Sequence, residues 1–96
     1  MKVIVDYLGN IKQTLSLKQA EQVELKHEAS IRDLLSYLAE KYGDPFRKNV
    51  YEPKDLDLKP HYILSLNGLL LNQLKGIETK LKDGDHVILM PVVTGG

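Results

Sequence analysis

The amino-acid sequence predicts an α+β fold in which one main helix packs on one face of a mixed sheet of four to five strands. Two observations lead to this fold class. Short β-rich segments stand at both ends of the chain and in its second half. One longer segment, residues 30–43, instead carries apolar residues at the three- and four-residue spacing of an amphipathic helix. A hairpin followed by a helix and further strands is typical of a domain with the helix on one sheet face.

The first two predicted strands form a hairpin. Residues 2–8 are rich in β-branched and aromatic side chains on both faces, which predicts a central strand. Gly9 and Asn10 end this strand. Residues 11–17 fit either a short helix or a loop. Residues 23–27 alternate apolar and polar side chains, so we expect a half-buried strand antiparallel to the first.

The main helix is expected to begin after Ser30. The Ser30 side chain can accept a hydrogen bond at the N-cap, and Asp33 stands three residues later, as in a capping box. Gly43 suits a left-handed C-cap. The apolar stripe that we expect to face the core consists of Ile31, Leu34, Leu35, Leu38 and Tyr42.

The segment after the helix, residues 44–61, is the least regular part of the chain because three prolines interrupt it. We expect a long loop with one helical turn near residues 46–50, and we expect Phe46 and Tyr51 to hold the segment against the body. A third strand is predicted at residues 62–66. The pair Asn67-Gly68 then predicts a turn, and the apolar run 69–71 follows it.

The final strand is predicted at residues 87–90, after the turn pair Asp83-Gly84. Pro91 should end its ladder, because proline has no N–H to donate. The chain therefore divides into a domain, residues 1–91, and a flexible C-terminal tail, residues 92–96. If the first and last strands pair in parallel, the helix lies within the crossover between the two halves. This arrangement is the β-grasp fold of ubiquitin.

Composition excludes several classes of function. Thirteen basic and thirteen acidic side chains cancel, which argues against a general nucleic-acid or membrane surface. There is no cysteine, so disulfides, thiolate catalysis and cysteine zinc sites are excluded. The three histidines lack metal-ligand spacing. No apolar stretch approaches membrane-spanning length. A soluble cytoplasmic protein that binds no metal is expected.

The end of the chain resembles a known family. An Asp83-Gly84-Asp85 turn, a strand, Pro91 and the closing pair Gly95-Gly96 together resemble the C-terminus of ubiquitin-like sulfur carriers. The likeness is closest to the small, MoaD-like subunit of molybdopterin synthase. The Asn67-Gly68 turn and the helix that opens at Ser30 extend the resemblance over most of the chain.

The resemblance implies a co-substrate rather than an enzyme. An E1-like adenylating enzyme would use ATP to adenylate the carboxylate of Gly96, and a sulfur donor would convert the adenylate to a thiocarboxylate. The molybdopterin synthase large subunit, or another acceptor enzyme, would then take the sulfur. The chain itself would bind no cofactor. The tail residues that would enter the partner's active site are Val92, Val93, Thr94 and Gly95.

Strand alternation places the expected docking surface. If the odd-numbered residues of the last strand point to the core, Ile88 and Met90 point outward. By resemblance, the partner-binding patch should include Leu70, Ile88, Met90 and Pro91, with Tyr7 as a further candidate. The alternative is that Leu70 and Met90 are ordinary core residues.

Other functions remain open at this stage. One is a ubiquitin-like protein modifier that is joined to target lysines through Gly96. Another is a carrier that delivers sulfur for tRNA thiolation. A third, from a different class, is a β-grasp interaction module whose terminal glycines are incidental.

Overall fold

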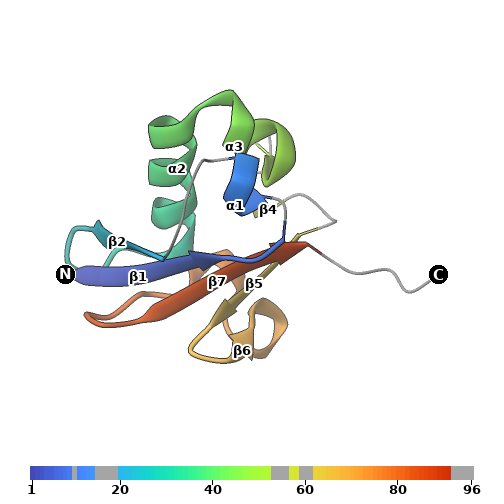
Figure 1. Ribbon diagram of the computed structural model, residues 1–96. Helices are drawn as coiled ribbons and strands as arrows, with labels where there is room; N and C mark the ends of the chain where they lie inside the picture. The colour runs from blue at the N-terminus through green and yellow to red at the C-terminus, as the bar shows by residue number, and fades with distance from the viewer. Residues whose placement is uncertain (10, 15–19, 53–56, 59–61, 92–96) are drawn as a thin grey trace.

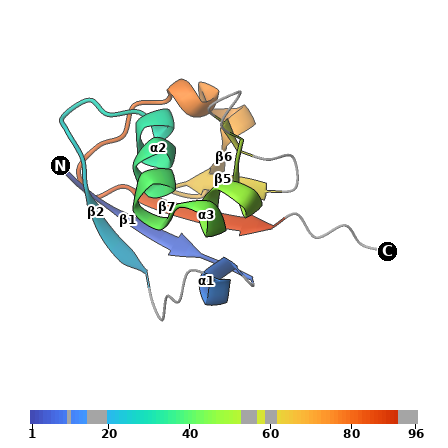
Figure 2. The same ribbon diagram turned by 90° about the horizontal axis from the view of Figure 1, so that it is seen from above.

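The protein is described by a computed structural model that covers residues 1–9, 11–14, 20–52, 57–58 and 62–91. A mixed five-stranded sheet forms one layer, and helix α2 covers one of its faces (Figure 1, Figure 2). The strands are β1 Lys2–Tyr7, β2 Glu21–Glu24, β3 Tyr51–Glu52, β4 Asp57–Leu58, β5 Tyr62–Leu66, β6 Leu69–Leu70 and β7 His86–Pro91. The helices are α1 Ile11–Thr14, α2 Ile31–Tyr42 and α3 Asp44–Asn49, with single 3₁₀ turns at Leu71–Gln73 and Gly76–Glu78.

The order of the sheet is β2-β1-β7-β5-β6, so the first and last strands of the chain lie side by side at its centre. β1 pairs antiparallel with β2 and parallel with β7, with Val5 opposite Val87. β5 pairs antiparallel with the other side of β7. The predicted β-grasp arrangement is therefore confirmed. β2 begins two residues earlier than expected and ends at Glu24, although the Leu25 N–H still donates to the Met1 carbonyl at 2.9 Å.

Helix α2 begins with the predicted capping box. The Asp33 N–H donates to Ser30 Oγ, and the Ser30 N–H donates to an Asp33 carboxylate oxygen at 2.8 Å. The backbone hydrogen bond from Ser30 is the main reason that the pKa of Asp33 lies below its usual value. Gly43 has the expected positive φ of 69°, but its ψ of −139° lies outside the left-handed helical region. The difference arises because Gly43 also precedes the first residue of α3.

Residues 44–52 are more regular than the sequence predicts. Six residues form α3, and Pro45 is the second of them. A two-stranded ribbon of β3 and β4 follows. Proline is tolerated in the first turn of a helix because its missing N–H would have no partner there. Phe46 is fully buried, as expected, and holds α3 against the body.

The core lies between α2 and the sheet. Its sheet side is formed by the inward-facing residues of the three central strands, and its helix side is formed by the apolar stripe of α2. The fully buried members include Val3, Val5, Tyr7, Leu34, Leu35, Leu38, Leu64, Val87 and Leu89. None of the helices in the described ranges combines the length and the apolar composition of a membrane-spanning segment.

The expected surface position of Tyr7 is wrong. Its side chain has no exposed area, because Tyr7 shares the inward face of β1 with Val3 and Val5. The Tyr7 hydroxyl donates to the Glu21 carboxylate at 3.2 Å, and the Tyr42 hydroxyl donates to the same oxygen. Burial, followed by the charge of Glu21, raises the pKa of Tyr7. Tyr7 therefore links β1, β2 and α2 and does not contribute to a docking surface.

Candidate functional site

The strand that leads to the tail is β7, and its place in the sheet is set by hydrogen bonds to β1. Ile4 N–H donates to the Asp85 carbonyl at 2.8 Å, and Leu8 N–H donates to the Leu89 carbonyl at 2.9 Å. In a parallel ladder, the next donor after this bond would be the N–H of residue 91. Pro91 has no N–H, so the ladder stops there.

β7 extends one residue further than expected, because Pro91 still lies opposite Tyr62 of β5. The pattern set by the β1 ladder directs the nitrogen of Pro91 toward β1, so pairing with β5 requires no donor from it. Residues 92–96, including the predicted reactive Gly96, lie outside the residues that the structure describes. What the structure does describe is the root of the tail.

The predicted orientation of β7 is confirmed. Val87 and Leu89 have no exposed area, whereas Ile88 and Met90 are half-buried on the face of the sheet away from α2. Ile88 lies opposite Ser65, and Met90 lies opposite Ile63. Their role in binding a partner stays a prediction.

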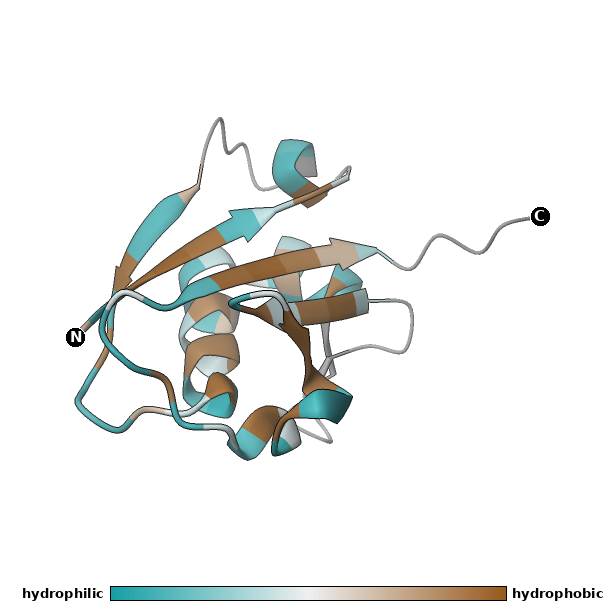
Figure 3. Ribbon diagram, turned by 90° about the horizontal axis from the view of Figure 1, so that it is seen from below, coloured by the Kyte–Doolittle hydropathy of each residue, from teal (hydrophilic) through white to brown (hydrophobic). Residues whose placement is uncertain are grey.

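Leu70 is not an ordinary core residue, since 40% of its surface is exposed. It lies opposite Ser65 of β5, so it shares the open face with Ile88. β1 contributes Ile4 to the same face, and 36% of the Ile4 surface is exposed. Leu8, which directly follows β1, is four residues after Ile4, so strand alternation places it on this face as well. We call this surface the apolar face: Ile4, Leu8, Ile63, Leu70, Ile88 and Met90. Figure 3, viewed from the side of this face, shows hydrophobic colouring along β5 and β7.

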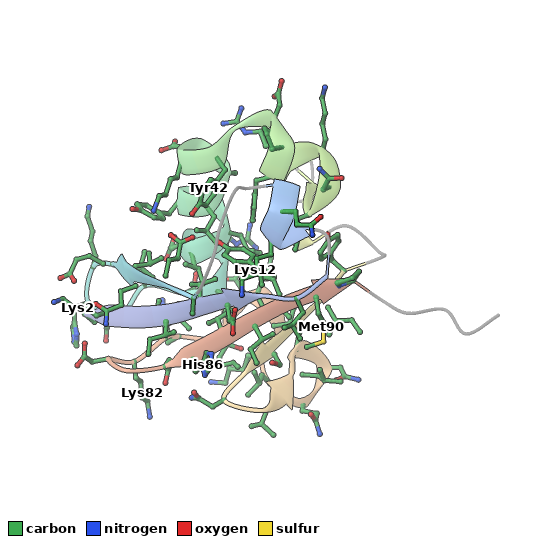
Figure 4. All side chains as sticks on the ribbon, viewed as in Figure 1. Lys2, Lys12, Tyr42, Lys82, His86 and Met90 are labelled. Carbon is green, nitrogen blue, oxygen red and sulfur yellow. The ribbon has the colours of Figure 1, made fainter. Side chains whose placement is uncertain are left out.

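A shallow hollow of about 260 Å³ lies at one side of the apolar face. It is lined by Tyr62, Ile63, Leu64, Leu70, Leu71 and Asn72. Ile63 is the register partner of Met90, so the hollow adjoins the end of β7. Figure 4 labels Met90 near this end, and it labels Lys2 and Lys82 at the opposite end of the sheet. β7 therefore ends beside the apolar face and away from these two charges.

The acidic turn before β7 serves the fold. Asp83 accepts the Lys2 N–H at 2.7 Å, and Asp85 accepts one hydrogen bond from the Asn67 side chain and one from the Lys82 N–H. Gly84 has the positive φ, 85°, that the turn requires. Within the described part of the chain, no group of His, Cys, Asp or Glu side chains is placed to hold a metal ion.

One residue at the tail root was missed by the sequence reasoning. The sequence pattern indicates only that Gly9 ends a strand, yet a Cβ placed on Gly9 would lie 2.9 Å from Cγ of Pro91. A glycine after a strand and a proline near the end of the chain are each visible in the sequence. Their contact is not, because it depends on the parallel pairing of β1 with β7.

Comparison with known proteins adds an independent finding. The sequence matches the ThiS family over residues 5–96. A relative from Archaeoglobus fulgidus, named as a candidate sulfur carrier protein, is 24% identical over 86 residues, which cover 90% of this chain and 96% of the relative.

Two solved structures are similar over nearly the whole chain. A candidate subunit 1 of the molybdopterin converting factor from Pyrococcus furiosus has a TM-score of 0.74 and 27% identity, over 97% of this chain and 99% of that one. Small archaeal modifier protein 1 from Haloferax volcanii has a TM-score of 0.81 and 19% identity, over 100% of both chains. At that identity the second likeness shows a shared fold.

Proposed function

The chain belongs to the ThiS family, and we propose that it acts as a sulfur carrier through the carboxylate of Gly96. A free carboxylate is a poor electrophile, so it has to be activated first. One carboxylate oxygen attacks the α-phosphorus of ATP, and the bond to pyrophosphate breaks. Sulfur at the oxidation level of sulfide, supplied by a donor, then attacks the carbonyl carbon. AMP leaves, and a thiocarboxylate remains on Gly96.

The observation that carries this proposal is the family match, which runs to residue 96 and so includes Gly95 and Gly96. The relative that is named as a candidate sulfur carrier also matches over 96% of its own length. Glycine at both last positions lets the tail enter a narrow active site, because neither residue has a Cβ. The adenylating enzyme holds the ATP, and this chain is its co-substrate.

The partner docks, in this proposal, on the apolar face. Five residues follow Pro91, and five extended residues span at most about 17 Å. The partner's nucleotide site therefore has to lie close to the end of β7. Exposed apolar patches on small proteins tend to mark binding sites. Leu70, Ile88 and Met90 supply such a patch beside the tail root, with Pro91 at its edge.

For the final acceptor we propose a pterin precursor held by the large subunit of a molybdopterin synthase. The support is the likeness, at 27% identity, to a chain named as a candidate subunit 1 of molybdopterin converting factor. A carrier for tRNA thiolation would use the same activated Gly96 and differ only in the receiving enzyme.

Protein modification is the second candidate function. The observation in its favour is the shared fold with small archaeal modifier protein 1. In this reaction the amine of a target lysine attacks the activated carbonyl of Gly96, AMP leaves, and an isopeptide bond forms. The two functions share the activation step and differ in the nucleophile that follows it.

The intact mass of protein isolated from its own cell separates these functions. A gain that corresponds to one oxygen replaced by sulfur supports the carrier. Lysine residues of other proteins that carry a Gly-Gly remnant support the modifier. Deleting Gly96 should abolish adenylation without lowering the melting temperature, and extending the chain by one alanine should do the same. The reactive role of Gly96 is refuted if native protein carries neither sulfur nor an adduct, and if the deletion and the extension variants both replace the wild-type protein in the cell without a change of phenotype.

A further inference from the structure

The root of the tail contains a contact that leaves no room for a side chain. A Cβ placed on Gly9 would lie 2.9 Å from Cγ and 3.0 Å from Cδ of Pro91. Gly9 has a φ of 79°, a conformation that other residues rarely adopt. Four further glycines, at positions 43, 68, 76 and 84, also have positive φ, but a Cβ on any of them would meet nothing within 4 Å. Among these glycines, only Gly9 is required both by its backbone conformation and by a neighbouring side chain.

The chemistry of proline explains this contact. Any other residue at position 91 would direct its N–H toward the Leu8 carbonyl. In Pro91 the nitrogen carries Cδ in place of this hydrogen. The ring therefore projects toward β1 just where the β1–β7 ladder ends, and Gly9 follows Leu8 directly. The absence of a Cβ on Gly9 provides the space that the ring occupies.

We infer that Gly9 and Pro91 form a steric pair that sets the direction in which the tail leaves the sheet. Gly9 is then a positioning residue for the reaction at Gly96. Both sides of the pair are held in place: Leu8 is hydrogen bonded to Leu89, and Pro91 lies opposite Tyr62. A ring that is pushed away from β1 turns the first bond of the tail with it.

The inference rests on the proposed function, because the direction of the tail matters only if Gly96 has to reach a partner's active site. When a partner holds the tail extended over about 17 Å, a turn of about 10° at its root displaces its end by about 3 Å. A misplacement of about 1 Å in an active site can lower the rate by on the order of 10²-fold. A small change at Gly9 is therefore expected to affect the chemistry at the far end of the tail.

The test compares Gly9→Ala with the matched variant Gly84→Ala. Gly84 has a φ of 85°, so both variants add a Cβ at nearly the same strained backbone conformation, but only the Cβ at position 9 meets Pro91. Adenylation is followed as pyrophosphate release by the cognate activating enzyme, with the carrier concentration varied. For Gly9→Ala we expect kcat to fall by about 10- to 100-fold. The KM for the carrier should stay near the wild-type value, because the apolar face is intact.

Two further measurements distinguish positioning from a loss of stability. The double variant Gly9→Ala/Pro91→Ala lacks Cγ and Cδ, so the Cβ at position 9 meets no ring and its kcat should equal that of Pro91→Ala alone. The backbone amide signals of residues 92–96 in NMR spectra should shift in Gly9→Ala and stay unchanged in Gly84→Ala. A destabilised carrier would instead show a lower melting temperature and a raised apparent KM at unchanged kcat. If Gly9→Ala does not fold, Pro91→Ala alone still tests the pair, because removal of the ring should lower kcat.

Equal kinetics of the Gly9 and Gly84 variants, with an active wild-type protein, would refute the steric pair and leave the proposed function intact. A kcat of the double variant that lies below that of Pro91→Ala, or a Pro91→Ala variant with wild-type kcat, would refute it as well. Failure of the wild-type protein to be adenylated at all would refute the proposed function, and the inference with it.

Discussion

Replacing Leu70 by alanine tests whether a partner docks on the apolar face. Leu70 is 40% exposed, so this fraction of its surface is available to a partner. Full burial of a leucine side chain contributes about 1.5–3 kcal/mol, and covering the exposed two fifths would contribute about 0.6–1.2 kcal/mol. Loss of this contribution weakens binding about three- to eightfold, since a factor of ten corresponds to about 1.4 kcal/mol.

The assay is titration calorimetry of the protein against the proposed activating enzyme. The matched control is Tyr37→Ala, because Tyr37 is 39% exposed but lies on α2, away from the open face of the sheet. We expect Leu70→Ala to weaken binding and Tyr37→Ala to leave it unchanged, with both variants near the wild-type melting temperature. An unchanged affinity for Leu70→Ala, or an equal loss for both variants, would show that the apolar face is not the docking surface.

Four further predictions concern the fold. Leu35→Asp should unfold the domain, because Leu35 is fully buried and the new charge would have no partner; a native far-UV circular dichroism spectrum would contradict this. Ser30→Ala should lower the free energy of unfolding in urea by about 1 kcal/mol, since it removes the N-cap acceptor. The pKa of Asp33 is lower in the folded protein than in the unfolded chain, so its stabilisation is full above the unfolded pKa and is lost as the pH falls through the folded pKa. Asp33→Asn should therefore flatten the fall of melting temperature with acidification, and an identical fall in both proteins would exclude this role. Asp85→Ala should cost about 1–3 kcal/mol in the same urea assay, because it leaves the donor groups of two hydrogen bonds without an acceptor; a loss within experimental error would refute it.

The elements that the sequence predicted well are those whose signals are local. The α2 capping box joins residues only three apart, and the apolar stripe of the helix repeats within a few residues. The Asn67-Gly68 turn is similarly local, and the structure gives both residues the positive φ values that a hairpin turn requires. Such features depend little on the rest of the chain, so a single sequence is enough to find them.

The burial of Tyr7 could not be predicted, because it depends on contacts between residues that are far apart in the sequence. β1 is apolar on both faces, so alternation alone does not say which face the helix covers. The hydroxyl group of Tyr7 favours a surface position until its acceptor is known. That acceptor is Glu21, fourteen residues away, and the contact exists only once β2 has paired with β1. The contact of Gly9 with Pro91 was hidden in the same way, across a still greater separation in sequence.

The central position of β7 explains why stability and function should be separable in this protein. Hydrogen bonds to β1 and β5 hold the strand on both sides, and the inward residues Val87 and Leu89 complete the core. A charged side chain at either of these two positions would unfold the domain, because it would be buried without a partner. The outward residues Ile88 and Met90 belong to the same hydrogen-bonded strand, but their side chains contribute less to the core. These side chains can therefore contact the proposed partner. Because side chains alternate along one strand, a single segment can hold the fold together and present the surface that we propose for docking.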